Sequence, residues 1–178
     1  TLPASDTDVL GGPATYVPKE KLFVFTLGDS SGIDVITVNI ATGAVRNHTD
    51  GGATGIYSMS FNPSDGLIYG LGIKAGGGGT DWQRSLVSLD PVSFKVKTIG
   101  VIPGYSIEVG GISAVNSPAH SLYWIGQAGP AGGNGPYYLL QNSLKDASTV
   151  SVSSDVFCAP AGGSAPPCPD SLEYRHRA

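Results

Sequence analysis

One pattern recurs three times along the chain and constrains its fold more than any other feature. Each copy is a proline, three polar or small residues, and then a leucine that opens a β-branched or aromatic run. The copies lie at residues 18–24, 63–69 and 118–124, and the matching prolines are 45 and then 55 residues apart. Because proline fixes φ and the small residues turn the chain, each copy predicts a turn that leads into a strand.

A second anchor follows each copy of the pattern. A further predicted strand stops at Asn39, Asp90 or Asn142, whose side chains can close a turn. One more short strand is predicted after that turn, and another before the proline. Each unit therefore holds about four short antiparallel strands, and the three units occupy residues 8–48, 55–100 and 109–153.

Four-stranded units repeated at this spacing are typical of β-propeller blades. The pattern, best seen in NPSDGLIYGLG followed by SLVSLDPVSFKVKTIG, resembles the secreted propeller repeats of the quinoprotein/YVTN-like superfamily. The resemblance implies an all-β, propeller-like array of about three four-stranded antiparallel blades over residues 1–154. A β-sandwich, which also consists of many short strands, is the alternative. The resemblance implies no chemistry, because propellers host lyases, lactonases, dehydrogenases and scaffolds alike.

Three blades are too few for a closed propeller, which usually has about 4–8. An open array exposes strand edges and an apolar blade face. The chain could be part of a larger propeller, two copies could close a six-bladed ring, or copies could join head to tail into a filament. Only 13% of its residues are charged, against about 25% in an average globular protein. This scarcity favours a surface that is covered by neighbouring copies or by sugar.

Two features predict an extracellular, secreted protein. Asn47 begins the glycosylation sequon Asn47-His48-Thr49. Cys158 and Cys168 lie in a Pro- and Gly-rich tail, residues 155–178, which offers no second pair of metal ligands. A disulfide between them is therefore predicted rather than a zinc site. No stretch approaches the ~18 consecutive apolar residues of a membrane span, so none is predicted.

The sequence contains no Gly-x-Ser-x-Gly, His-Glu-x-x-His or Walker motif. Its three histidines are dispersed, and the turn between Asp29 and Asp34 lacks the alternating acidic residues of a calcium loop. No catalytic residue, metal or cofactor is therefore predicted. Ten Lys and Arg against fourteen Asp and Glu give no basic patch for a nucleic acid.

Five residues are candidates for binding. Four are aromatic residues near predicted loops or strand ends, where rings can stack on a sugar or on a partner. The fifth, Glu108, begins the predicted innermost strand of the third unit, which would line the axial channel. The aromatic candidates are Trp82, which falls in a Gly-rich segment, Tyr105, Tyr137 and Tyr138.

These features together predict a non-enzymatic, extracellular structural glycoprotein that assembles with copies of itself through blade edges and faces, as a fibre, sheath or matrix component. One alternative is a propeller module that binds carbohydrate or protein. Another is a fragment of a propeller hydrolase or lyase whose site residues lie on other blades.

Overall fold

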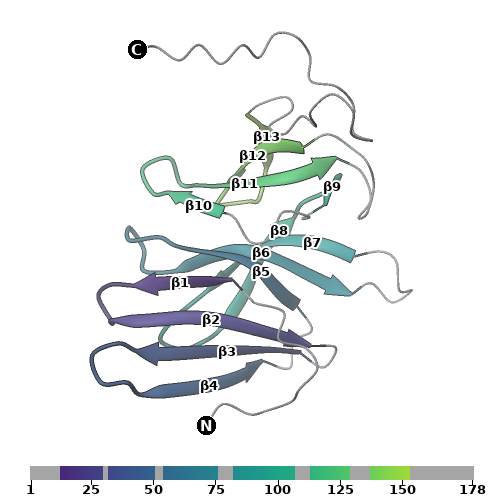
Figure 1. Cartoon of the computed structure of the whole chain (residues 1–178). Helices are drawn as coiled ribbons and strands as arrows, with labels where there is room; N and C mark the ends of the chain where they lie inside the picture. The colour runs from purple at the N-terminus through teal and green to yellow at the C-terminus, as the bar shows by residue number, and fades with distance from the viewer. Residues whose placement is uncertain are drawn as a thin grey trace, which may run out of the picture.

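The computed structural model describes residues 13–29, 32–50, 54–75, 82–106, 113–128 and 137–152. Within these ranges the chain is all β and forms three antiparallel sheets that lie one upon another (Figure 1). The first blade consists of β1 (Ala14–Val17), β2 (Leu22–Asp29), β3 (Gly32–Asn39) and β4 (Val45–Asp50). The second consists of β5 (Thr54–Phe61), β6 (Ile68–Ala75), β7 (Trp82–Leu89) and β8 (Val96–Val101). The third consists of β10 (Ser113–Asn116), β11 (Ser121–Ala128), β12 (Tyr137–Ser143) and β13 (Thr149–Ser151), with β9 (Tyr105–Ser106) also paired to β11.

The prediction of three four-stranded antiparallel blades is confirmed. In each blade the four strands pair in sequence order, so each strand is followed by its neighbour in the sheet. The third blade has one addition, because β9 and β10 pair with different parts of the same edge of β11. The described ranges hold no helix that is long and apolar enough to cross a membrane.

One six-residue turn recurs between the last two strands of every blade, and we call these three segments the outer turns. In each of them the N–H of the fifth residue donates to the carbonyl oxygen of the first, and the fifth residue has a positive φ. The outer turns are residues 39–44 (Gly43 N to Asn39 O, 2.8 Å; φ 71°), 90–95 (Phe94 N to Asp90 O, 2.8 Å; φ 60°) and 143–148 (Ala147 N to Ser143 O, 3.0 Å; φ 61°).

The turns predicted at Asn39 and Asp90 are confirmed. Asn39 Oδ1 accepts hydrogen bonds from two backbone N–H groups of its turn, each at 3.0 Å, and Asp90 Oδ1 accepts two in the same way, at 2.9 and 3.3 Å. The turn predicted at Asn142 is wrong by one residue. Ser143 begins the third outer turn, and Asn142 is a buried residue of β12.

The first hairpin of the third blade shows the same displacement. Leu22 pairs with Asn39, the first residue of its outer turn, and the residue that pairs with Ser143 is Ser121. Leu122 is therefore one position away from the structural equivalent of Leu22. Because side chains alternate along a strand, one position reverses the face. Leu22 accordingly packs toward the blade that follows it, whereas Leu122 packs toward the blade that precedes it.

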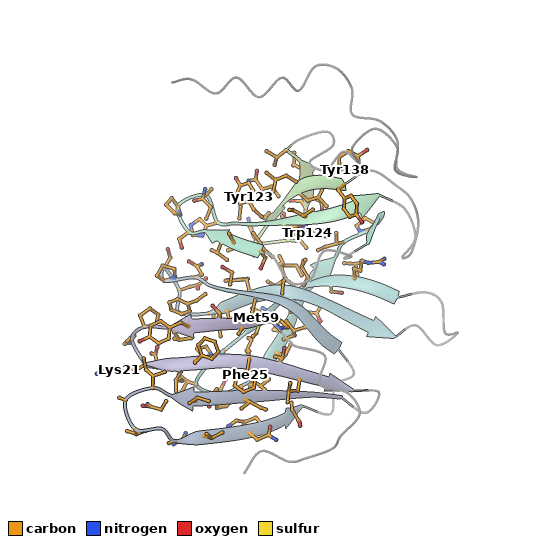
Figure 2. The ribbon with its side chains drawn as sticks, in the orientation of Figure 1. Lys21, Phe25, Met59, Tyr123, Trp124 and Tyr138 are labelled. Atoms are coloured by element: carbon orange, nitrogen blue, oxygen red, sulfur yellow. The ribbon has the colours of Figure 1, made fainter. Side chains whose placement is uncertain are left out.

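Within the described residues, two hydrophobic clusters join the blades. The cluster between the first and second blades includes Val24, Val35, Met59, Ile68 and Val87. The cluster between the second and third blades includes Tyr69, Leu71, Leu86, Leu122, Trp124 and Leu140. Figure 2 shows Met59 at the first of these joints and Trp124 at the second. The middle blade is therefore packed on both of its faces.

Candidate functional site

Each terminal blade has a face that no other described blade covers. We call the side of a blade that meets the preceding blade its leading face, and the side that meets the following blade its trailing face. In the first blade Val24 and Val35 lie on the trailing face, at the joint with the second blade. Phe23, Phe25 and Ile36 alternate with them and so lie on the leading face, which points away from the other two blades.

The leading face of the first blade is apolar and largely open. Tyr16 and Phe23 pair across β1 and β2, and both side chains are exposed. The rings of Phe23 and Phe25 lie 6.3 Å apart between centroids and are tilted by 48°. Val45, at the start of β4, is also exposed, while Ile36 near the centre of the face is buried. Clusters of exposed apolar side chains of this kind mark interaction surfaces on folded proteins.

The trailing face of the third blade is its counterpart at the other end of the array. Figure 2 shows Tyr123 and Trp124 on opposite sides of β11, with Trp124 toward the second blade. Tyr123 and Ile125 are half-buried on the outward side. Val150 pairs with the residue opposite Tyr123, so it lies on the same face, where it is exposed. Both ends of the array thus present apolar side chains outward.

The outer turns connect neighbouring blades. At the first joint Phe94, the fifth residue of its turn, stacks on His48 of β4, with ring centroids 3.5 Å apart and planes at 13°. At the second joint Ala147, the fifth residue of its own turn, lies so close to Gly100 of β8 that a Cβ on that glycine would stand 2.9 Å from Ala147 Cβ. In both joints the fifth residue of an outer turn therefore rests on the outermost strand of the preceding blade.

A buried polar network reinforces the second joint. Asn62 is completely buried, and its Nδ2 donates to Asp65 Oδ2 at 3.0 Å while its Oδ1 accepts a 2.5 Å bond from the Ser117 hydroxyl of the third blade. The Tyr69 hydroxyl donates to the same Asp65 oxygen at 2.7 Å. Burial, and then the bond to the Asp65 carboxylate, raise the pKa of Tyr69 well above its usual value. These bonds fix the hairpin of the second blade against the third.

The acidic side chains of the outer turns serve the turns themselves. The backbone N–H of Val92 and then the hydroxyl of Ser93 lower the pKa of Asp90, because both donate to its carboxylate. The hydroxyl and N–H of Ser148 lower the pKa of Asp146 for the same reason. Among the described residues no group of three or more His, Cys, Asp or Glu could hold a metal ion.

The structure separates the predicted binding residues. Tyr138 packs against the cluster at the second joint, and Tyr137, one position earlier on β12, lies on the opposite, outward face. Trp82 is the first residue of β7, paired with Ala75, rather than part of a loop. Tyr105 is in β9, which pairs with the end of β11 in the third blade, so Trp82 is on a different blade from the three tyrosines. These four aromatic residues therefore do not form one surface.

The remaining predicted residues fall into two groups. Asn47 is exposed on β4, opposite Ile36, and so lies at the outermost strand of the leading face. Glu108, Cys158 and Cys168 lie outside the described residues, and so does the disulfide predicted between the two cysteines.

Sequence reasoning predicted an uncovered apolar blade face but did not identify its residues, although one segment carries their signal. Residues 22–27 read Leu-Phe-Val-Phe-Thr-Leu, so apolar side chains fall on both sides of the strand. A strand that is apolar on both sides is typical of a sheet that is covered on both faces. In the first blade the described residues supply the cover on one face only.

Comparisons with known proteins bear on the fold. No family model and no curated protein matches the sequence. Among solved structures, TolB from Acinetobacter baumannii matches with a TM-score of 0.52 and 16% identity over 82% of this chain and 33% of its own. An oligogalacturonate lyase in complex with manganese matches with a TM-score of 0.54 and 12% identity over 80% of this chain and 39% of its own. The β-propeller domain of the trilobed protease from Pyrococcus furiosus matches with a TM-score of 0.39 and 10% identity over 72% of this chain and 38% of its own.

These structures are β-propeller proteins, and the chain has a propeller-like fold. At identities this low the likeness concerns the fold alone. The chain spans 33% of the length of TolB and 39% of that of the lyase.

Proposed function

We propose that this chain is a non-catalytic, extracellular β-propeller module that assembles with copies of itself through the outward faces of its terminal blades. One comparison of burial carries the proposal. Phe23, Ile68 and Leu122 hold the same position in their blades, each paired with the residue just before an outer turn. Ile68 and Leu122 are 1% and 0% exposed, whereas Phe23 is 41% exposed.

The position of Phe23 is therefore one that is buried in the other two blades, and no described blade covers it in the first. Removal of apolar surface from water stabilises an assembly by roughly 25 cal/mol per Å². Few charges oppose such contact, since only 13% of the residues are charged. A second copy offers a matching apolar surface on the trailing face of its third blade.

Sedimentation velocity across a concentration series tests the proposal. The wild-type chain is expected to sediment as an oligomer, and Phe23→Glu is expected to weaken association at least tenfold, since it places a charge in the contact. Val101→Glu is the matched control, because Val101 is similarly exposed but lies on the middle blade. A wild-type chain that remains a monomer at all concentrations overturns the proposal.

Glycosylation at Asn47 is part of the proposal and is compatible with assembly. Thr98 holds the equivalent position on β8, opposite Val87 of the first joint, and it is exposed although the first blade packs on that face. A sugar on Asn47 would thus lie at the rim of the contact. Secretion from a eukaryotic host should give a mass shift that a peptide N-glycosidase removes and that Asn47→Gln abolishes. Secreted protein without sugar would contradict this part.

The non-catalytic part has its own test, because one similar fold is that of an oligogalacturonate lyase in complex with manganese. The chain incubated with oligogalacturonate and manganese is expected to release no unsaturated product. Product formation above a heat-denatured control would show that the chain is an enzyme and would leave the assembly test unaffected.

A further inference from the structure

One contact between blades occurs twice in the structure. The two residues that would form a third contact of the same kind, Gly43 and Val152, have no such contact among the described residues. Resting on the self-assembly proposed above, we infer that the outer turn of the first blade, residues 39–44, docks on Val152 in the third blade of a second copy. The contact joins the two copies head to tail, leading face to trailing face.

The two joints within the chain define what the contact requires. The receiving residue sits on the outermost strand, opposite the residue four positions before the outer turn of its own blade. His48 opposite Val35 and Gly100 opposite Leu86 satisfy this rule, and they receive Phe94 and Ala147 respectively. The two joints use the same strand positions although their side chains differ. We therefore take the arrangement to be a property of the blade backbone rather than of a particular pair of side chains.

Val152 is the receiving residue of the third blade. It lies opposite Leu139, four positions before Ser143, and its N–H donates to the Leu139 carbonyl oxygen at 2.8 Å. In the described part of the chain no turn rests on it, and its side chain is 48% exposed. The third blade therefore has a receiving position of the same kind as the first two.

Gly43 is the corresponding turn residue of the first blade, and in the described part of the chain it docks on no strand. It occupies the fifth position of its outer turn, as Phe94 and Ala147 do in theirs, and no described atom lies within 4 Å of the place where its Cβ would be. The second residue of the same turn, Ile40, is 58% exposed, although its equivalent at the second joint, Leu144, is 8% exposed. The whole turn is therefore open where its two counterparts are docked.

The paired residues differ in total size between the two joints. The first joint pairs two rings, those of His48 and Phe94, while the second pairs Gly100 with the small Ala147. Between copies a glycine would meet a valine, so the open pair brings together a residue without a side chain and one of moderate size. In total side-chain size this pair lies between the two pairs within the chain, so the same positions can pack it closely.

A second copy of the chain is the occupant that these observations favour. The chain carries both halves of the contact, one at each end, and a head-to-tail interface uses two different surfaces of one molecule. Three blades from each of two copies would give six, which lies within the range of about 4–8 blades of closed propellers.

Cysteine cross-linking tests the contact between residues 43 and 152. Gly43→Cys and Val152→Cys are made in separate chains, both with Cys158→Ser and Cys168→Ser so that native thiols do not react. The two chains are mixed and oxidised mildly. The expected result is a reducible species of twice the chain mass in the mixture, with at least a tenfold lower yield in either chain alone.

The substitution at Gly43 suits the fold, because Phe94 and Ala147 carry side chains at the same position with φ of 60° and 61°. Val92→Cys replaces Gly43→Cys as the matched control, since Val92 is an exposed residue of the outer turn of the middle blade. It is expected to form no cross-link with Val152→Cys. Circular dichroism of each chain shows that it is folded before mixing.

The outcomes separate this inference from the proposal on which it depends. The contact is supported if a cross-link forms in the mixture of the Gly43→Cys and Val152→Cys chains and in none of the controls. A wild-type chain that sediments as an oligomer while this pair fails to cross-link overturns the contact and leaves self-assembly standing. A monomeric wild-type chain overturns both. Ile40→Asp adds an independent measurement, because it is expected to weaken association at least tenfold while the circular dichroism spectrum stays that of the wild type. Unaltered association would contradict the contact.

Discussion

The two joints between blades have the same geometry but different chemistry. The first is aliphatic, with Val24, Val35 and Met59 among its buried residues, and one aromatic stack closes its outer end. The second buries Trp124, and its buried polar groups are linked from one blade to the next. A blade therefore specifies where its neighbour lies, while the side chains at each joint decide how tightly and how selectively the neighbour is held.

The polar bonds of the second joint account for its selectivity. Trp124 Nε1 donates to Asn142 Oδ1, and the Asn142 amide donates to the Ala147 carbonyl of the outer turn at 2.8 Å. The Val115 N–H of the third blade donates to Ser60 of the second at 3.0 Å. The first two bonds lie within the third blade and hold Trp124 in place, whereas the bond from Val115 to Ser60 and that from Ser117 to Asn62 cross the joint. A buried polar group without its partner costs about 1–3 kcal/mol, so a displaced third blade would lose both crossing bonds. The first joint, with fewer of them, is expected to tolerate substitution better.

Trp124→Ala is expected to have the largest effect. The change removes a fully buried indole and leaves Asn142 Oδ1 without its donor, so the free energy of unfolding should fall by about 3–5 kcal/mol. Tyr123→Ala, one residue away on the outward face, should cost less than half as much. Urea denaturation measures both, and equal losses would contradict the assignment of the two faces.

Gly100→Ala comes next, because the close contact at the second joint has no room for a methyl group. Its Cβ would stand 2.9 Å from Ala147 Cβ and 3.0 Å from the Asp146 carbonyl oxygen. The expected loss is about 1–3 kcal/mol. Ala147→Gly should recover part of it in a double-mutant cycle by thermal denaturation, since it removes one of the two clashes. Additive effects in the cycle would show that the two residues do not touch.

His48 tests the first joint in the same way, with a smaller effect. His48→Ala removes the stack on Phe94 and is expected to cost about 0.5–1.5 kcal/mol. His48→Phe keeps the stack and removes Nε2, a buried atom without a hydrogen-bond partner among the described residues, so it should leave stability unchanged or raise it. Chemical denaturation of both variants decides this. A phenylalanine variant as unstable as the alanine one would show that the ring contact contributes nothing.

The three-blade repeat could be predicted from the sequence because turn chemistry and alternation are local. The alignment of the third blade could not, because proline is accepted at more than one position of a turn. In the first blade the turn begins at Pro18, whose carbonyl oxygen accepts a hydrogen bond from the fourth residue, Lys21. In the third blade the equivalent turn begins at Ser117, whose carbonyl oxygen accepts from His120, so Pro118 is the second residue of its turn. The sequence pattern aligned the prolines and so matched Leu122 with Leu22, although the two residues lie on opposite faces of their blades.

An uncovered apolar face was predicted, but the residues that form the outward faces and the contacts of the outer turns could not be predicted, for a different reason. The pairs His48 with Phe94 and Gly100 with Ala147 join segments that are far apart in the sequence. Whether Phe23 is covered depends on which blade lies beside it, and local pattern carries no information on that. The apolar residues on both sides of β2 indicate that a cover is needed, without identifying it.

The last prediction concerns the stability of the second joint at alkaline pH. Tyr69 lies at this joint, and the equivalent position of the first blade is occupied by Val24, which does not titrate. Burial and the bond to Asp65 raise the pKa of Tyr69 in the folded chain, while in the unfolded chain it is about 10. The stability that the protonated Tyr69 hydroxyl contributes is fully present below about pH 10. It is lost as the pH rises toward the pKa of Tyr69 in the folded chain, because the unfolded chain releases the phenol proton first. Tyr69→Phe should cost about 1 kcal/mol at neutral pH through the lost hydrogen bond. Above pH 10 the variant should lose stability less steeply than the wild type, and parallel curves of unfolding free energy against pH would contradict the burial of a neutral phenol at this joint.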